Sequence, residues 1–307
     1  MRLLTRGSPL AIVQAERMAD AIRSFGRSVE IVPFSTRGDR EASRPLRCFG
    51  GSGAFSCCIE EALLRGEGEG AVHSLKDIPS CCRDGLDIAA VLPRDNVEDV
   101  LIGRDETTLA SMPPGAVVGT SSPRRRAQIL RSRPDLATAE LRGNVATRLS
   151  RLREGQYDAV ILARAGLDRL GLLPSNAETL PSLPAPCQGI IALEAPLGSS
   201  LFSLGTAISC RNTFLCALAE RTLLRTLRVG CHIPFAALAR LDGKTLDFRA
   251  EILDDSGRDF RFFSTSRNVA SPDDAVEAGM ELAERIRTDA CAMRILAATL
   301  VPTDGRP

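Results

Sequence analysis

Lysine is nearly absent from this sequence. Of the 39 lysine and arginine residues in its 307 positions, only Lys76 and Lys244 are lysines. A guanidinium is planar and permanently charged, whereas an ammonium is a compact charge whose pKa shifts readily with its surroundings. Because arginine is used almost everywhere else, we expect Lys76 to have a role that an arginine cannot fill.

Aromatic side chains are also scarce. The chain has no tryptophan and a single tyrosine, Tyr157, and its formal net charge is only +1. Proteins that bind single-stranded nucleic acid stack its bases on aromatic platforms, which this composition does not offer. With no strong overall field, any anion binding must be local. We therefore expect no nucleic-acid partner.

Long apolar runs are missing as well. No stretch of about 18 apolar residues occurs, which is the length that a membrane-spanning helix needs. The first residues lack the apolar segment and the small-residue cleavage site of a secretory signal peptide. From these features we expect a mature cytoplasmic protein without a membrane partner.

Ten cysteines are present, but they do not form a recognisable framework. Two pairs are adjacent in sequence, Cys57–Cys58 and Cys81–Cys82, and no C-x-x-C spacing occurs. The chain has only two histidines, His73 and His232, so the pattern argues against a zinc site. We expect most of the cysteines to be free thiols in a reducing compartment.

The pattern of strands and helices predicts two kinds of domain. Up to about residue 227, short apolar strands alternate with helices, which is typical of mostly parallel sheets covered by helices on both faces. Three strands and a helix follow at about 235–287 and predict a small α+β domain with antiparallel hairpins. The length is also more than a single core normally supports. Expected elements include strands at 29–34, 71–75, 117–119, 139–141 and 159–163 and helices at 125–131, 145–153 and 214–227.

One segment places two opposite charges at the end of a strand. The sequence Ala71-Val-His-Ser-Leu-Lys-Asp-Ile-Pro79 reads as an apolar strand that delivers Lys76 and Asp77 side by side before a proline turns the chain. Such a pair at a strand end is a candidate for chemistry on a charged substrate.

Three turns from strand to helix carry arginines. They are Arg6-Gly-Ser8, the segment 118–126 with Ser122 and Arg124 to Arg126, and the segment 141–148 with Arg142 and Arg148. Helix N-termini favour anions, and arginine matches carboxylates with two hydrogen bonds at once. A solvated basic helix start is the alternative, although clustered arginines repel one another unless something neutralises them. No G-x-x-x-x-G-K-[ST] motif occurs, so a polycarboxylate fits better than a nucleotide.

A cysteine occupies a tight turn after the predicted helix 214–227. The segment Val229-Gly-Cys-His-Ile-Pro234 places Cys231 between a glycine and a proline. Taken alone, this pattern favours a packing cysteine.

Taken together, the motifs resemble the porphobilinogen deaminase (hydroxymethylbilane synthase) family. They keep the order and spacing of that family from residue 6 to beyond residue 230. The matching segments are Arg6-x-Ser-x-Leu-Ala-x-x-Gln14, Thr36-Arg-Gly-Asp39, Ala71 to Pro79, Gly119-Thr-Ser-Ser122, Arg142-Gly-Asn-Val-x-Thr-Arg-Leu149, Tyr157-Asp-Ala-Val-Ile-Leu-Ala163, Ala165-Gly-Leu-x-Arg-Leu-Gly171, Gln188-Gly189 and Ala219-Glu-Arg221.

The resemblance implies a transferase of tetrapyrrole (heme) biosynthesis. Such an enzyme joins four porphobilinogen units, releases ammonia at each step and forms the linear tetrapyrrole hydroxymethylbilane. A dipyrromethane cofactor is attached by a thioether to a cysteine, which the motif match places at Cys231. The resemblance thus reverses the interpretation of Cys231 as a packing residue, and it also implies a monomer.

The family fold predicts two lobes like those of periplasmic binding proteins, plus the small C-terminal α+β domain. Mapped onto this chain, domain 1 covers residues 1–92 and 190–208 and is the catalytic lobe. Domain 2 covers 93–189 with the anion-binding arginines, and domain 3 covers 209–307 with the cofactor cysteine.

The resemblance also implies roles for individual residues. Asp77 is the expected catalytic residue, because a carboxylate stabilises the cationic methylene-pyrroline that loss of ammonia leaves. Lys76 is expected to hold a carboxylate of the substrate or cofactor. The residues expected to bind the cofactor are Arg6, Ser8, Lys76, Ser122, Arg124, Arg125, Arg142, Asn144, Arg148, Arg169, Gln188 and, covalently, Cys231.

The sequence departs from the family pattern at several positions. Ser52 stands where most members have a lysine, and a second family lysine falls at or beside Arg47 and Cys48. Glu98 replaces an arginine, Cys187 replaces a glycine, and Val229 replaces the first glycine of Gly-Gly-Cys. These changes keep a second hypothesis open, a two-lobed binding protein for a pyrrole or other polycarboxylate with weak or lost catalysis.

Overall fold

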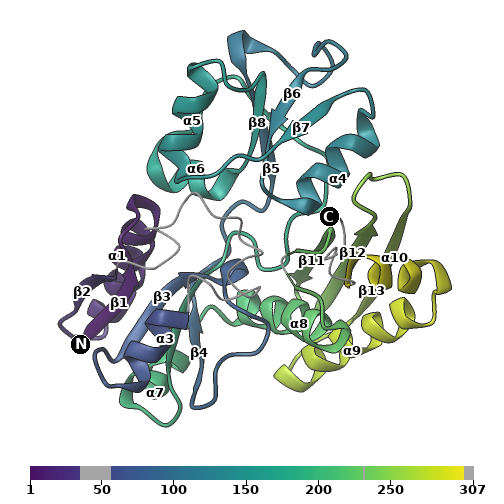
Figure 1. Ribbon diagram of the computed structural model, residues 1–307. Helices are drawn as coiled ribbons and strands as arrows, with labels where there is room; N and C mark the ends of the chain where they lie inside the picture. Colours follow the sequence, from purple (N-terminus) through teal and green to yellow (C-terminus); the bar gives the residue numbers. More distant parts are fainter. Residues whose placement is uncertain (35–56, 231, 301–307) are drawn as a thin grey trace, which may run out of the picture.

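The computed structural model describes residues 1–34, 57–230 and 232–300. In this part of the chain the strands form two five-stranded sheets and one three-stranded sheet. Each sheet is the centre of its own helix-covered body, and the three bodies meet around the middle of the molecule (Figure 1). The predicted class, two mostly parallel α/β lobes with a small α+β domain, is confirmed.

The first sheet combines the N-terminal strands with one strand from much later in the chain. Its order is β2-β1-β3-β10-β4, and β10 alone runs antiparallel to its neighbours. Two helices pack on one face and one on the other. The strands are β1 (Arg2–Arg6), β2 (Glu30–Phe34), β3 (Gly70–Ser74), β4 (Leu86–Val91) and β10 (Ile191–Pro196), and the helices are α1 (Pro9–Arg23), α7 (Ser200–Ile208) and α3 (Cys57–Leu64).

The second sheet repeats this arrangement. Its order is β7-β6-β8-β5-β9, with β5 antiparallel to its neighbours. Helix α4 packs on one face, and α5 and α6 pack on the other. The elements are β5 (Asp99–Gly103), a 3-10 turn (Arg104–Glu106), β6 (Val117–Gly119), α4 (Pro123–Ser132), β7 (Ala137–Ala139), α5 (Val145–Arg153), β8 (Ala159–Ala163), α6 (Arg164–Leu170) and β9 (Ala177–Thr179).

The antiparallel strand of each sheet, β10 in the first and β5 in the second, is the one that follows a crossing from the other lobe. The chain leaves the first sheet after β4 and enters the second at β5, then returns from β9 to the first at β10. Two crossover segments, 92–98 and 180–190, therefore connect the lobes. The domain boundaries themselves stay a prediction. One strand was predicted wrongly: the strand expected at 139–141 ends at Ala139, where its pairing with β6 ends.

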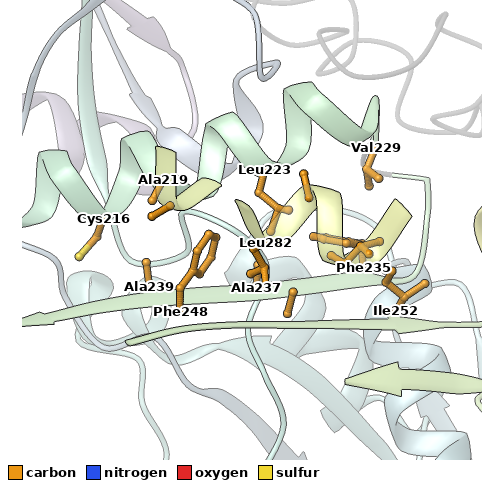
Figure 2. Packing of buried hydrophobic residues seen from close by; sticks show 14 of the residues in the cluster. Cys216, Ala219, Leu223, Val229, Phe235, Ala237, Ala239, Phe248, Ile252 and Leu282 are labelled. Carbon is orange, nitrogen blue, oxygen red and sulfur yellow. The ribbon is translucent and has the colours of Figure 1, made fainter. Parts of the chain in front are cut away.

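The third sheet belongs to the C-terminal body. Its strands β11 (Phe235–Asp242), β12 (Thr245–Leu253) and β13 (Phe260–Asn268) form an antiparallel meander. Three helices pack against it, α8 (Arg211–Leu227), α9 (Pro272–Arg287) and α10 (Ala290–Leu300). Figure 2 shows the interface, where Phe248 and Leu282 meet Leu223 in a fully buried core.

None of the described helices is by itself long and apolar enough to cross a membrane. The helices α7 and α8 reach that length and composition only when taken together, and the chain bends by 110° between them.

Candidate functional site

The turn after β3 presents Lys76 and Asp77. Residues Leu75–Asp77 form one turn of 3-10 helix. The flanking side chains Leu75 and Ile78 are buried in an apolar cluster that also contains Val91. The backbone N–H of Leu75 donates to the carbonyl of Ile190, the residue before β10, at 3.0 Å. Anchored in this way on both sides, Lys76 is half-buried and Asp77 is exposed.

Lys76 reaches across to the crossover between the lobes. Its Nζ donates to Oε1 of Gln188 at 3.1 Å. Burial and the nearby Arg125 lower the pKa of Lys76 to about 8, against the opposing effect of Asp77. At that value the ammonium can lose its charge close to neutral pH, which an arginine cannot do.

Gln188 continues this connection into the second lobe. Its side chain is 1% exposed, and its Nε2 donates to the carbonyl of Val97 at 2.7 Å and to Oδ1 of Asp99 at 2.9 Å. Lys76 of the first lobe and Asp99 of the second are thus joined through one amide.

Asp99 is the counterion of two of the predicted arginines. Arg124 donates to its Oδ2 at 2.6 Å, and Arg125 donates to its Oδ1 from Nη2 at 2.8 Å. All three side chains are buried. Burial alone would raise the pKa of Asp99, but the two guanidinium groups outweigh it and hold this pKa far below its usual range.

This arrangement bears on the repulsion expected among the clustered arginines. Asp99 pairs with both Arg124 and Arg125 inside the protein and offsets one of their two positive charges. The contribution of these two arginines to ligand binding stays a prediction. Asp99 itself was not identified from the sequence, although a carboxylate at the start of the apolar run 99–103 was a usable signal.

Arg148 links the two lobes electrostatically. Burial and repulsion from Arg125, Arg142 and Arg151 lower the pKa of Arg148 to about 10, whereas Asp77 of the first lobe raises it. Its Nε donates to the carbonyl of Gly143 at 2.8 Å. The structure thus places Arg125 and Arg142 within electrostatic range of Arg148, and Arg148 within electrostatic range of Asp77.

The predicted polar residues of the helix starts act as caps. Ser8 accepts from the N–H of Ala11 and Ser122 from the N–H of Arg125, and each precedes a proline in the first helical turn. Asn144 accepts from the N–H of Thr147 at 2.9 Å. These caps fix the turns that carry the arginines. Arg6 lies at the end of β1, directly before the first of them.

Arg169 lies apart from this cluster. Its Nε donates to Asp95 at 2.8 Å and its Nη2 to the carbonyl of Gly189 at 2.7 Å, so it ties α6 to both crossover segments. Arg17 of α1 pairs with the same carboxylate at 3.1 Å. The structure therefore places Arg169 at the junction of the lobes.

A second buried ion pair fastens this junction to the third body. The Nε of Arg94 donates to the backbone carbonyl of Gln188, and its Nη1 donates to Oε1 of Glu220 at 2.6 Å. Glu220 is fully buried in α8 and also accepts from the N–H of Cys187 at 2.5 Å. Arg94 was not identified from the sequence, although Glu220 lies inside the quoted motif Ala219-Glu-Arg221.

One departure from the family pattern has a visible consequence. Cys187 has a φ of 61°, in the left-handed region that glycine adopts without strain. A cysteine there carries a strain of about 1 kcal/mol. The positions Arg47, Cys48, Ser52 and Cys231 lie outside the described residues.

Comparison with known proteins identifies matches along most of the chain. A family model described as "Porphobilinogen deaminase, dipyromethane cofactor binding domain" matches residues 1–200, and one described as "Porphobilinogen deaminase, C-terminal domain" matches residues 214–288.

Individual proteins agree with these matches. A porphobilinogen deaminase from Xanthomonas axonopodis pv. citri is 41% identical over 290 residues, which cover 92% of this chain and 94% of that protein. One from Stenotrophomonas maltophilia is 44% identical over 252 residues, covering 80% and 83%. Among solved structures, a periplasmic substrate-binding protein from Coxiella burnetii aligns with a TM-score of 0.44 and 17% identity, over 70% of this chain and 94% of that one.

Proposed function

The chain belongs to the porphobilinogen deaminase family, and we propose that Asp77, Lys76 and the arginines of the second lobe form its active site. The protein is a hydroxymethylbilane synthase, a transferase that joins porphobilinogen units into a linear tetrapyrrole with release of ammonia. A binding protein without catalysis is not favoured, since the relatives carry the name of the enzyme.

The observation that supports this site is the charge pattern across the lobes. Burial, together with repulsion from Arg125, Arg142 and Arg151, lowers the pKa of Arg148 to about 10. A carboxylate bound among them would relieve this repulsion. Every pyrrole of the substrate carries an acetate and a propionate, so the cluster suits a growing chain of such units.

The residues present fit the dipyrromethane cofactor, which has the same carboxylates. We assign its carboxylates to Arg6, Arg142, Arg148 and Lys76, with the helix starts at Ser8 and Ser122 offering further N–H groups. When bound, the cofactor supplies the pyrrole to which the first substrate unit is joined. We propose Cys231 as the residue that holds it, on the motif Gly230-Cys-His-Ile-Pro234.

Asp77 acts on the reacting pyrroles. Its carboxylate stabilises positive charge that develops on a substrate unit as ammonia leaves, and it accepts hydrogen bonds from pyrrole N–H groups. Lys76 holds a carboxylate as a point charge while Gln188 fixes the direction of its side chain. We further propose that the enzyme is a cytoplasmic monomer.

Intact-mass measurement of the protein as expressed in cells tests this function. The expected result is a mass above that of the chain, with further discrete increases after porphobilinogen is added. Cys231→Ser should abolish both, whereas the control Cys291→Ser in α10 should keep them. A wild-type mass equal to the bare chain, or normal turnover by Cys231→Ser, would overturn the proposal.

A further inference from the structure

A carboxylate is buried on the outer face of the third sheet. Alternate residues of β12 from Leu246 to Ile252 face the helices and form the core. Glu251 lies on the opposite face, as Arg249 does, but Arg249 is exposed whereas Glu251 is only 4% exposed. The alternation breaks here because α4 of the second lobe covers this end of the strand (Figure 1).

Both oxygens of Glu251 are bound by side chains of α4. Nε2 of Gln128 donates to Oε2 at 2.8 Å, and Nη1 of Arg131 donates to Oε1. The Arg131 guanidinium also lies over the ring of Phe260 on β13, 4.8 Å from its centre. A buried carboxylate with two charged or polar donors is strongly coupled to them, because neither side can be removed without leaving the other unpaired.

The contact with Gln128 leads to the active-site arginines. Oε1 of Gln128 accepts from Nη1 of Arg124 at 2.9 Å. Arg124 is held by Asp99, and Asp99 accepts from Gln188, which accepts from Lys76. Glu251 can only accept hydrogen bonds and Arg124 can only donate them. The two together therefore fix which way the Gln128 amide points.

The backbone of the third sheet also touches α4 directly. The turn after β12 contains Gly257 with φ at +73°, and a Cβ there would lie 2.1 Å from the carbonyl oxygen of Ala127. The turn therefore packs on the helix as closely as a glycine permits. At the other end of β12, Gly243 has φ at +58° and no atom within 4 Å of such a Cβ.

From these contacts we infer that Glu251 is a positioning residue for α4 that, through Gln128, holds Arg124 at a fixed place relative to the third body. The inference rests on the function proposed above, in which the third body holds Cys231 and α4 begins at the site where substrate carboxylates bind. A fixed distance between these two bodies sets where a bound carboxylate lies relative to the point of attachment.

The test uses Glu251→Leu and Glu251→Gln in the full-length enzyme, with Glu277→Gln as control, since Glu277 is an exposed partner of Arg267 in the same body. We expect Glu251→Leu to increase hydrogen exchange in the first turns of α4 and to raise KM for porphobilinogen roughly tenfold, the effect of losing about 1.4 kcal/mol of binding. Glu251→Gln keeps one acceptor and should lie between Glu251→Leu and wild type. Glu277→Gln should match wild type.

Glycine variants test the same contact without altering a charge. Gly257→Ala should reproduce the increased exchange in α4 and the raised KM, whereas Gly243→Ala, at an equally left-handed but open position, should leave both unchanged. This pair keeps the proposal testable if Glu251→Leu does not fold.

The outcomes separate this inference from the proposed function. A wild-type enzyme without covalent cofactor or turnover would refute the proposed function. A wild-type enzyme with both, combined with unchanged α4 exchange and unchanged KM in Glu251→Leu and Gly257→Ala, would refute the positioning role alone. A fall in kcat with constant KM would also refute it, because that is the effect of a smaller folded fraction.

Discussion

The two lobes have the same strand order but carry different charged residues at equivalent turns. Their sheets have equivalent strand orders. The second strand of each sheet, β1 in the first lobe and β6 in the second, leads into a helix that has a serine cap and a proline at its first position. This turn is Ser8-Pro9 in the first lobe and Ser122-Pro123 in the second. In the first lobe a single arginine, Arg6, precedes the cap, whereas two buried arginines follow it in the second.

The third strand of each sheet shows the larger difference. β8 leads directly into α6, whereas β3 leads into a single 3-10 turn that carries Lys76 and Asp77. The second lobe thus offers permanent positive charge, and the first offers a carboxylate and a lysine with a pKa of about 8. Under the proposed function, the same topology binds an anion in one half and carries the reacting carboxylate in the other.

The largest effect should come from Asp77, the charge that has no counterpart in the second lobe. Asp77→Ala should lower kcat by at least about a hundredfold, because it removes the group that stabilises positive charge in the transition state. Its side chain is exposed, so the fold should persist. Ammonia release and thermal unfolding would be measured side by side. The control is Asp84→Asn, an exposed carboxylate further along the same loop. Near-normal turnover by Asp77→Ala would show that catalysis does not depend on this difference between the lobes.

Asp99 should have the next largest effect, on stability. Asp99→Asn leaves Arg124 and Arg125 buried without their counterion, which costs about 3–5 kcal/mol. Urea unfolding at neutral pH measures this loss. Asp158→Asn is the control, because its partner Arg104 is about two-fifths exposed. A loss equal to that of the control would mean that the second lobe does not need an internal counterion.

The same carboxylate predicts a dependence on acid. The pKa of Asp99 is lower in the folded than in the unfolded state. The ionised Asp99 carboxylate with its two arginines therefore stabilises the fold above about pH 4, and this stabilisation is lost as pH falls towards the folded-state pKa. The free energy of unfolding of wild type should therefore decrease below about pH 4 more steeply than that of Asp99→Asn. Parallel curves would contradict the assignment.

Lys76 should produce a smaller effect that appears only at alkaline pH. Its charge is lost as pH rises through about 8, so binding of substrate carboxylates should weaken there. Lys76→Arg should remove this alkaline limb from the pH profile of kcat/KM, even if its overall activity is lower.

The same pKa shift of Lys76 affects stability in the opposite direction. Between about pH 8 and the ordinary lysine pKa near 10.4, Lys76 keeps its proton in the unfolded state and has lost it in the folded state. The free energy of unfolding should therefore rise with pH over this interval in wild type and not in Lys76→Met.

Individual helices and strands were predictable from the sequence because residue periodicity and capping residues lie within each element. The helix at Val145–Arg153 and the strand at Ala159–Ala163 lie where periodicity places them, and the serine caps were visible as a residue type before proline. Strand neighbours were not predictable from periodicity, because β10 joins the first sheet after almost a hundred residues of the second lobe. Discontinuous organisation was expected only from the family resemblance.

The site shows the same division. Lys76 and Asp77 stood out by composition, and the arginines by their place at helix starts. Asp99 and Glu251 were missed because a carboxylate in a strand reads as a solvent-facing residue until the body that covers it is known. Burial at Glu251 depends on α4, more than a hundred residues earlier in the chain.

The smallest effects should come from the two serine caps and test whether the equivalent turns are also energetically equivalent. Ser8→Ala and Ser122→Ala each remove the acceptor for one N–H of the first helical turn, so each should lower the free energy of unfolding by about 1 kcal/mol. Ser199→Ala, which removes the cap of α7, should cost a similar amount. The two turns should differ in catalysis: Ser122→Ala loosens the turn in front of Arg125 and should raise KM more than Ser8→Ala does. Equal KM values for both variants would indicate that the shared frame, and not the arginines that follow the second cap, determines how the substrate is held.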